Sequence, residues 1–211
     1  MWEKKVFQVA LPTHNNAKTI RACLKSVNKC LEREQWHLVV GDNNSTDDTV
    51  NIIKDIIPEL SCQTNLLLEF PDAINSATAK NRVLNVCGSF AQDRPCVLGM
   101  NPDGLMRPFR IKLYDKAKEE NAPMVVGPWR WSIWKKSGTV KTKNITQCLE
   151  ELQFTWACTL MNAQLINAKG NMFNEDLEFY EDILLWHQIK YMPYGFQMVG
   201  SDYPQDVYHH L

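Results

Sequence analysis

The sequence lacks a long hydrophobic run. No stretch of the 211 residues approaches the run of about 18 apolar residues that a membrane-spanning helix needs. Residues 1–12 also contain no apolar segment of the length typical of a secretory signal peptide. We therefore expect a soluble, cytoplasmic protein.

An excess of charge of one sign is also missing. The chain has 23 Lys and Arg against 24 Asp and Glu, which gives a formal net charge of -1. This balance produces no overall attraction to nucleic acid or to an anionic membrane, so binding of either kind needs a local cluster of charge. The seven cysteines include no C-x-x-C pair, which argues against a zinc site and favours reduced thiols that serve as small core residues.

What is present is an ordinary globular composition in which short apolar runs alternate with helical patterns. Hydrophobic residues make up 45% of the chain, and the length suits a single domain, residues 1–211, with its own core. Apolar runs predict strands at 6–11, 37–41, 66–70 and 96–100. The spacing between them predicts helices at about 17–32, around 50–57, around 79–87 with Gly88 at the end, and from Pro108 onward. This order is typical of an open, mostly parallel α/β sheet flanked by helices.

The second half of the sequence is less regular. Residues 124–131 and 134–142 predict a small antiparallel hairpin region. A helix is expected at 179–189 and a late strand at 196–200.

Polar residues follow three of the predicted strands. Thr13 and Asn15 follow the first, Asp42 follows the second, and Asn101 and Asp103 follow the fourth. Ligands of open α/β sheets bind beyond the carboxyl ends of the strands. Turns favour such residues in any case, so each loop alone fits an ordinary turn. Together the three loops indicate a nucleotide pocket.

Several segments, in order, resemble family-two glycosyltransferases with the GT-A fold. VALPTHNNAKTIRACLKSVNKC, followed by HLVVGDNNSTDDTV, resembles the family's first strand, polar loop and helix and its Asp-Asp-Gly-Ser-Thr-Asp segment. AKNR at 79–82 resembles the Ala-Arg-Asn segment, and VLGMNPDGLMRP resembles the strand that carries the Asp-x-Asp motif. GNMFNEDLEFYED resembles the late Gly-Gly-Phe-Asp-Glu…Glu-Asp block. The resemblance covers most of residues 5–190, and the shared order makes it specific.

The resemblance implies a Rossmann-like GT-A domain with a nucleotide-sugar-binding half at 1–107 and an acceptor-binding half at 108–211. It also implies an inverting hexosyl- or pentosyltransferase that uses a nucleotide-sugar donor, with a UDP-sugar as the first choice, and a divalent metal. By the same resemblance, the residues expected to contact the donor nucleotide are Thr13, Asn15, Asp42, Lys80, Asn81, Arg82 and Asn101. For Lys80 and Arg82, a position on a solvated helix face is the competing interpretation.

The metal is expected at the segment that resembles the Asp-x-Asp motif. Negative charge builds on the departing phosphates, and a divalent cation neutralises it as a Lewis acid. Asp103 matches the second acid of the motif and is expected to bind Mn²⁺ or Mg²⁺. Asn101 stands where the family has its first Asp, so this chain has one carboxylate fewer there. His209 and His210 are further candidate ligands, with an exposed His pair or a tag remnant as the alternative.

The expected catalytic base is Asp182, which matches the last acid of the late block. An inverting transfer needs a carboxylate that accepts the proton of the attacking hydroxyl. Glu181, beside it, is expected to orient the acceptor. Ordinary acids at a helix N-terminus, favoured by the helix dipole, are the alternative interpretation of both.

The acceptor is expected to contact the segment 127–144, where indole and basic side chains alternate. Such a segment can stack on bases and follow a phosphate backbone, stack on sugar rings, or form a solvated hairpin with buried indoles. By analogy with viruses that glycosylate hydroxymethylated bases in their own DNA, one expected acceptor is such a base in phage DNA, in the host cytoplasm. The other acceptor class is a cell-surface glycan or lipopolysaccharide. The expected acceptor contacts are Trp129, Arg130, Trp131, Trp134, Lys135 and Lys136.

Two further function classes remain open. A nucleotidyltransferase also combines an α/β nucleotide domain with metal-binding acids, but residues 12–16 lack the glycine typical of its phosphate loop. An inactive nucleotide-sugar-binding module is the second class, because Asn101 replaces the first Asp of the family's metal-binding motif. Asp103 and the pair formed by Glu181 and Asp182 favour an active enzyme.

Overall fold

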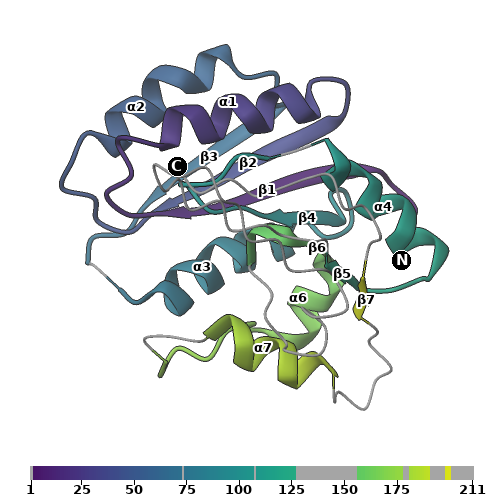
Figure 1. The fold of residues 1–211 in the computed structure, drawn as a ribbon. Helices are drawn as coiled ribbons and strands as arrows, with labels where there is room; N and C mark the ends of the chain where they lie inside the picture. The colour runs from purple at the N-terminus through teal and green to yellow at the C-terminus, as the bar shows by residue number, and fades with distance from the viewer. Residues whose placement is uncertain are drawn as a thin grey trace, which may run out of the picture.

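The computed structural model describes residues 2–72, 74–106, 108–126, 156–177, 181–190 and 198–200. Its strands form one mixed sheet in the order β3-β2-β1-β4-β6-β5-β7, with helices on both faces (Figure 1). The expected open α/β sheet with an antiparallel part in the second half is therefore confirmed.

The first half of the chain supplies the parallel part of the sheet. β1 pairs with β2 and β4, and β2 pairs with β3, all in parallel. The register places Thr13 beside Asp42, so the two strands end at the same level. Three of these strands, β1, β2 and β4, coincide with apolar runs because their side chains are covered on both faces of the sheet, whereas the edge strand β3 is only partly buried. The strands are β1 (Val6–Thr13), β2 (Gln35–Asp42), β3 (Thr64–Glu69) and β4 (Cys96–Gly99).

The second half adds an antiparallel part that the sequence only partly indicates. β6 (Thr159–Asn162) lies between β4 and β5 (Met124–Val126) and runs antiparallel to both. β7 (Met198–Gly200) pairs with β5 in parallel at the sheet edge. Of the predicted hairpin, residues 124–126 form β5, and the remainder lies outside the described residues.

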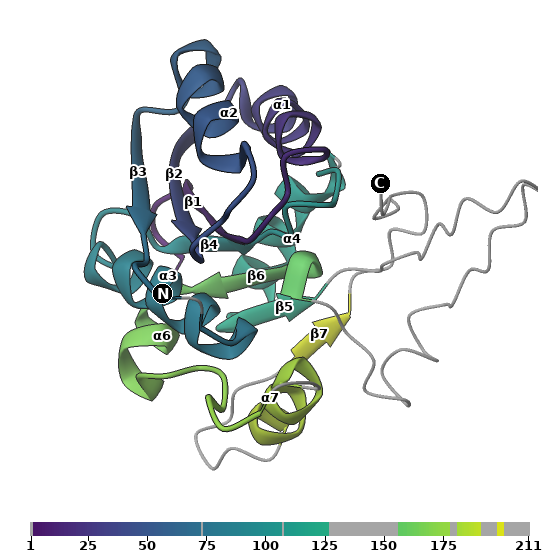
Figure 2. The same cartoon turned by 90° about the vertical axis from the view of Figure 1, so that its left-hand side faces the viewer.

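Helices cover the sheet as two layers (Figure 2). One hydrophobic cluster joins one face of the sheet to the helices at Ile20–Leu31, Thr49–Ile56 and Phe109–Glu119. A second cluster joins the other face to the helices at Ser76–Ser89, Ala163–Lys169 and Glu181–Lys190. Within the part of the chain that the structure describes, no helix is both long enough and apolar enough to cross a bilayer. The helices are α1 (Ile20–Leu31), α2 (Thr49–Ile56), η1 (Ile57–Glu59), α3 (Ser76–Ser89), α4 (Phe109–Glu119), η2 (Trp156–Cys158), α6 (Ala163–Lys169) and α7 (Glu181–Lys190).

Gly88 does not end α3, contrary to the sequence prediction. The helix continues to Ser89, and Gly88 keeps an ordinary helical backbone. A Cβ atom at Gly88 would clash with the side chain of Asn167, which donates a hydrogen bond to the Gly88 carbonyl over 2.9 Å. The glycine therefore allows α6 to pack closely against α3.

Candidate active site

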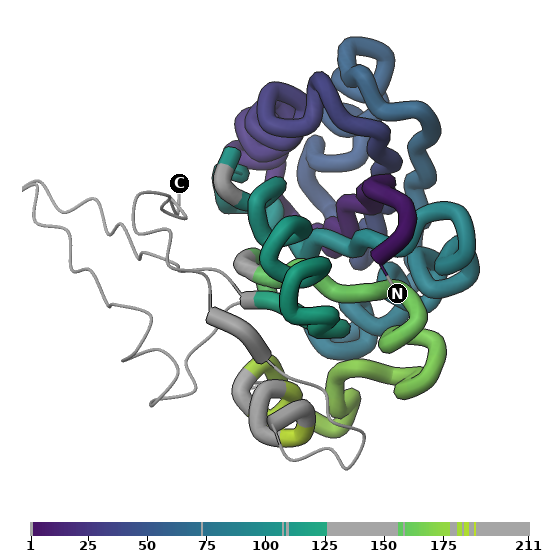
Figure 3. The backbone as a smooth tube through the Cα atoms, turned by 90° about the vertical axis from the view of Figure 1, so that its right-hand side faces the viewer, coloured from purple at the N-terminus to yellow at the C-terminus, as the bar shows by residue number. Residues whose placement is uncertain are grey.

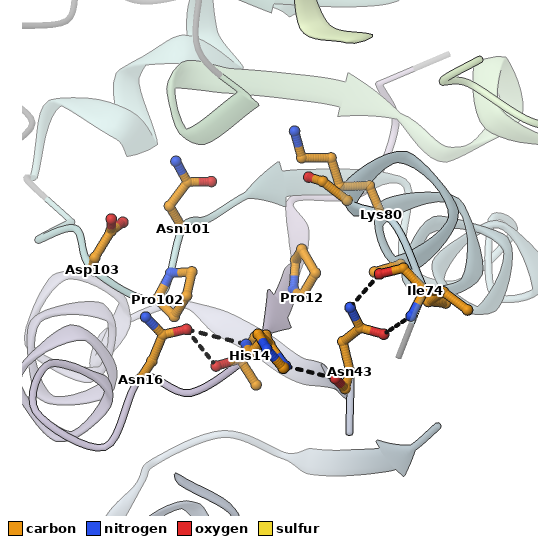
Figure 4. Close-up of a pocket in the computed structure, with 12 residues that line it drawn as sticks. Pro12, His14, Asn16, Asn43, Ile74, Lys80, Asn101, Pro102 and Asp103 are labelled. Atoms are coloured by element: carbon orange, nitrogen blue, oxygen red, sulfur yellow. Dashed lines mark hydrogen bonds between the residues drawn. The ribbon is translucent and has the colours of Figure 1, made fainter. Parts of the chain in front are cut away.

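A cavity of about 470 Å³ opens beyond the carboxyl ends of β1, β2 and β4 and beside the start of α3. This volume lies within the range of about 300–1,000 Å³ typical of small-molecule pockets. It is found at the sheet edge that the sequence predicts for ligand binding. Figure 4 shows its lining, which comprises Pro12, Thr13, His14, Asn16, Asn43, Ile74, Ser76, Ala79, Lys80, Asn101, Pro102 and Asp103.

The loops after β1 and β2 are joined by hydrogen bonds on one side of this cavity. Asn15 adopts a left-handed conformation, with φ of 51°. Its amide N–H donates to Ser45 Oγ over 2.8 Å, and its side-chain oxygen accepts from the Thr46 amide over 2.8 Å. The Ala17 amide donates to Asp47 over 3.0 Å. Asn15 therefore joins the two loops and does not line the cavity, although the sequence resemblance predicts a contact with the donor.

Asp42, another expected donor contact, is buried at the end of β2 and also does not line the cavity. Its carboxylate accepts hydrogen bonds from Ser45 Oγ over 2.6 Å and from the Ser45 amide over 2.9 Å. The intervening Asn44 has φ of 57°, the left-handed region that glycine adopts easily. Asp42 thus closes the turn after β2.

Asn43 is the residue of this segment that lines the cavity, and it was not expected from the sequence. Its side-chain amide donates to the Ile74 carbonyl over 2.6 Å and accepts from the Ile74 amide over 2.9 Å. The ring of His14 lies 2.7 Å from the Asn43 carbonyl oxygen. The family motif Asp-Asp-Gly-Ser-Thr-Asp offers a signal for Asn43. Asn44, which has a left-handed backbone, aligns with the glycine of that motif, so Asn43 aligns with its second Asp.

The expected metal-binding turn follows β4. Asn101 and Asp103 both line the cavity, and the Gly104 amide closes the turn by donating to the Asn101 carbonyl over 3.1 Å. The Cys23 thiol donates to the same carbonyl over 3.4 Å. Burial raises the pKa of the Cys23 thiol, and the nearby negative charge of Asp103 raises it further. The thiol therefore stays protonated and acts as a structural donor beneath the turn.

The Lys80 ammonium connects the cavity to the expected catalytic acids. It lies 2.9 Å from Glu181 Oε1 and 2.6 Å from Asp182 Oδ1. Burial alone raises the pKa of the Glu181 carboxyl, but the charge and hydrogen bond of Lys80 outweigh burial and hold that pKa below its ordinary value. Lys80 also lies 5.0 Å from the centre of the Phe173 ring. Asp182 does not line the cavity itself but contacts Lys80, which does.

Asn81 and Arg82 lie on α3 next to Lys80 but do not line the cavity. The Asn81 side chain donates to the Phe173 carbonyl over 2.8 Å and to Glu175 over 2.8 Å, and it accepts from the Phe173 amide over 2.8 Å. The Arg82 guanidinium lies 5.1 Å from the centre of the Phe70 ring. The structure thus gives Asn81 the role of fixing the 171–177 loop on α3.

The cavity lining suits a hard divalent cation that takes most of its oxygen ligands from a bound diphosphate and water. Asp103 is the one carboxylate among the described residues of the lining, and Asn101 offers an amide oxygen. Across the described ranges, no cluster of three or more His, Cys, Asp or Glu side chains is present. Mg²⁺ typically uses one or two carboxylates and completes its shell with phosphates and water. The residues fit such a cation when a diphosphate is bound.

The remaining expected contacts lie outside the described residues. These are the candidate metal ligands His209 and His210 and the acceptor contacts Trp129, Arg130, Trp131, Trp134, Lys135 and Lys136.

Comparison with known proteins adds to this geometry. Residues 8–187 match the family model described as glycosyl transferase family 2. The structure is similar to S. aureus TarS 1–349 in complex with UDP, with a TM-score of 0.70, 16% identity and coverage of 97% of this chain and 60% of that chain. It is also similar to the mannosyltransferase PcManGT from Pyrobaculum calidifontis in complex with GDP-Man and Mn²⁺, with a TM-score of 0.69, 18% identity and coverage of 97% and 56%. The chain thus spans less than two thirds of the length of either structure, and no curated protein sequence matches it.

Proposed function

The chain belongs to glycosyltransferase family 2 and has the GT-A fold, and we propose that it transfers a sugar from a nucleotide-sugar donor to an acceptor hydroxyl. One observation carries the proposal. Thr13 at the end of β1 and Asn101 and Asp103 after β4 meet Lys80 in a single cavity at the carboxyl edge of the sheet. We assign donor binding to residues 1–107 and acceptor binding to residues 108–211.

The nucleoside of the donor is proposed to lie against the loops after β1 and β2. Thr13, His14 and Asn43 line the cavity there, and Figure 4 shows His14 beside Asn43. The reciprocal bonds between Asn43 and Ile74 fix the rim of this part of the cavity before any ligand binds. TarS binds UDP and PcManGT binds GDP-Man. We propose a UDP-sugar, which a panel of nucleotide sugars would test directly.

The diphosphate is proposed to lie between the turn after β4 and α3. Figure 4 shows Asn101 and Asp103 on one side of the cavity and Lys80 on the other. Asp103 and Asn101 would hold Mn²⁺ or Mg²⁺ together with phosphate oxygens, and the cation would stabilise the charge that develops on the leaving group. The Lys80 ammonium lies on the opposite wall, where it is paired with Glu181 and Asp182.

Asp182 is proposed to act as the base of an inverting transfer. The acceptor oxygen forms a bond to the anomeric carbon while the bond from that carbon to the phosphate oxygen breaks, and the nucleoside diphosphate leaves. The proton of the acceptor hydroxyl passes to Asp182. The side chain of Asp182 is 22% exposed and that of Glu181 is 11% exposed, so Asp182 is the more accessible acid. Glu181, which is ion-paired with Lys80, is proposed to orient the acceptor.

A matched pair of variants tests the assignment of the base. Asp182→Asn should lower kcat by about 10²–10⁴-fold, because general-base catalysis typically contributes that factor. Asp176→Asn is the control, since Asp176 is an exposed Asp in the same sequence block and is also preceded by a Glu. Release of nucleoside diphosphate and of glycosylated product would be measured with and without Mn²⁺. Equal activity of the two variants would contradict the assignment.

The acceptor proposal rests on the sequence segment 127–144. A hydroxymethylated base in DNA and a cell-surface glycan or lipopolysaccharide are the two acceptor classes. Replacement of Lys135, Lys136 and Lys141 by Ala should abolish transfer to hydroxymethylated duplex DNA if the segment follows a phosphate backbone. Unchanged turnover on that duplex would exclude DNA recognition by this segment and leave the glycan class.

A further inference from the structure

Trp156 lies between the two parts of the proposed site. It opens the short helix η2, directly before β6, and is 1% exposed. Its indole Nε1–H donates to the Met100 carbonyl over 3.1 Å, and its backbone N–H donates to Asp182 Oδ2 over 3.1 Å. Met100 directly precedes the turn that carries Asn101 and Asp103. One residue therefore contacts both the chain that leads into the metal-binding turn and the proposed base.

A second set of contacts links Trp156 to Asp182 through Phe173 and Lys80. The Trp156 ring packs edge-to-face against Phe173, with the ring centres 5.6 Å apart. Phe173 lies 5.0 Å from the Lys80 ammonium, and that ammonium contacts Asp182 Oδ1 over 2.6 Å. Each oxygen of the Asp182 carboxylate is thus fixed by a different donor, Oδ1 by Lys80 and Oδ2 by the Trp156 amide.

The close packing of Trp156 on β4 depends on Gly99. A Cβ atom at Gly99 would lie 2.5 Å from the Trp156 carbonyl oxygen and 2.7 Å from its ring. Both distances are too short for real contacts, so any larger residue must displace Trp156 or the strand. The absence of a side chain at Gly99 therefore sets how near η2 lies to the end of β4.

We propose that Trp156 is a positioning residue that holds the Asn101–Asp103 turn and Asp182 at a fixed separation. This inference rests on the proposed function, because the separation matters only if a donor at the turn reacts with an acceptor at Asp182. A displacement of about 1 Å between reacting groups can lower a rate by about 10²-fold without changing how the substrates bind. Trp156 is thus expected to affect the rate of transfer and not the affinity for the donor.

The variant that tests this inference is Trp156→Phe, which keeps an aromatic ring and removes the indole N–H. Its kcat is expected to fall at least about 10-fold, while the KM for the nucleotide sugar stays within about twofold. Calorimetric titration with the nucleoside diphosphate and Mn²⁺ should give unchanged affinity. A merely structural role would lower the amount of folded enzyme without producing this separation of kcat from KM.

Trp2→Phe is the matched control. Trp2 is 4% exposed, and its indole N–H donates to the backbone carbonyl of Ala122 over 2.8 Å. It precedes β1 and therefore lies at the amino end of the sheet, away from the cavity, and its ring contacts that of Tyr114 on α4. Figure 3 marks the N-terminus of the chain. The variant loses the same kind of hydrogen bond and should lower the melting temperature while leaving kcat unchanged.

Gly99→Ala provides an independent test if Trp156→Phe folds poorly. It keeps the indole and forces Trp156 away from β4, so it should lower kcat in the same way. Gly88→Ala is its control, because the added methyl group meets the Asn167 side chain between α3 and α6. Both variants would be compared at equal folded concentration, measured by circular dichroism.

A double-mutant cycle with Asp182→Asn decides the outcome. If Trp156 acts through Asp182, its replacement should have little further effect on the residual activity of the Asp182→Asn enzyme. Fully additive effects, or a loss of kcat no larger than that of Trp2→Phe, would overturn the positioning role while the proposed function stands. An absence of transfer by the unaltered enzyme with every nucleotide sugar would overturn both.

Discussion

At the scale of single residues, Lys80 balances the charge behind the cavity. The structure gives it two carboxylate partners within 2.9 Å, and its side chain is 9% exposed. Lys116 on α4 also contacts two carboxylates, Glu119 and Glu120, but in solvent. The two lysines therefore separate the effect of burial from the effect of pairing.

Lys80→Met should destabilise the protein by about 3 kcal/mol, because removal of one partner leaves buried charge without compensation. Lys116→Met should change stability little, since water screens exposed ion pairs. Urea unfolding followed by circular dichroism would measure both. A Lys80 variant as stable as the Lys116 variant would contradict the assigned role of the buried pair.

His37 makes stability depend on pH near neutrality. Burial on β2, and secondarily the charge of Arg94, hold the pKa of His37 below its ordinary value. The unfolded chain therefore takes up this proton first as pH falls, so the free energy of unfolding should decrease as pH drops below about 6.5. Melting temperatures between pH 8 and pH 5 would measure the effect. His37→Gln should flatten the profile over that range, and an unchanged slope would contradict this assignment.

The sequence predicted part of the site residue by residue. Thr13, Lys80, Asn101 and Asp103 were expected from motifs and do line the cavity. Asn43 was missed because the choice between adjacent polar residues depends on which one faces inward, and only the left-handed turn at Asn44 decides that.

At the scale of helices and strands, α3 and α6 both begin with an asparagine cap, but only α3 lines the cavity. Asn75 begins α3 by accepting from the Thr78 amide over 2.9 Å, and its side chain donates to the Glu175 carbonyl over 2.5 Å. Asn162 begins α6 by accepting from the Gln164 amide over 2.9 Å. The first turn of α3 lines the cavity.

Replacement of either cap by Ala should cost about 1 kcal/mol of stability. Asn75→Ala should also weaken donor binding severalfold, because it loosens the start of α3. Asn162→Ala should leave donor affinity unchanged. Calorimetric titration with the nucleoside diphosphate and Mn²⁺ would compare the two variants. Equal affinities would show that the start of α3 does not shape the donor site.

Periodicity explains which elements the sequence could predict. β1, β2 and α1 have long, regular apolar patterns, and the structure places them as expected with small shifts at their ends. β6 and α6 were not predicted, because the strand passes directly into the helix with no glycine or proline between them. The apolar residues of such a joined segment do not show where a strand ends and a helix begins.

At the scale of the whole molecule, the donor is expected to stabilise the fold. A ligand at 100 times its Kd adds about 2.7 kcal/mol to the free energy of unfolding. For a chain of this size that gain raises the melting temperature by about 5–10 °C. A thermal-shift screen of nucleotide sugars with Mn²⁺ should show this rise.

Asp103→Asn should reduce the part of the thermal shift that depends on Mn²⁺, because it removes the carboxylate of the cavity lining. The nucleotide alone should give the same shift with the variant and with the unaltered protein. If no nucleotide sugar changes the melting temperature with or without the metal, the proposed donor class is wrong.

Asn15 holds the loops after β1 and β2 together, and this affects the entropy change when a nucleoside binds. Because the backbone on that side of the cavity already occupies one conformation, an incoming nucleoside has little chain entropy to remove there. Selectivity between bases at this end then follows from the shape of a rigid surface, whereas adaptation to different sugars falls to the rest of the site.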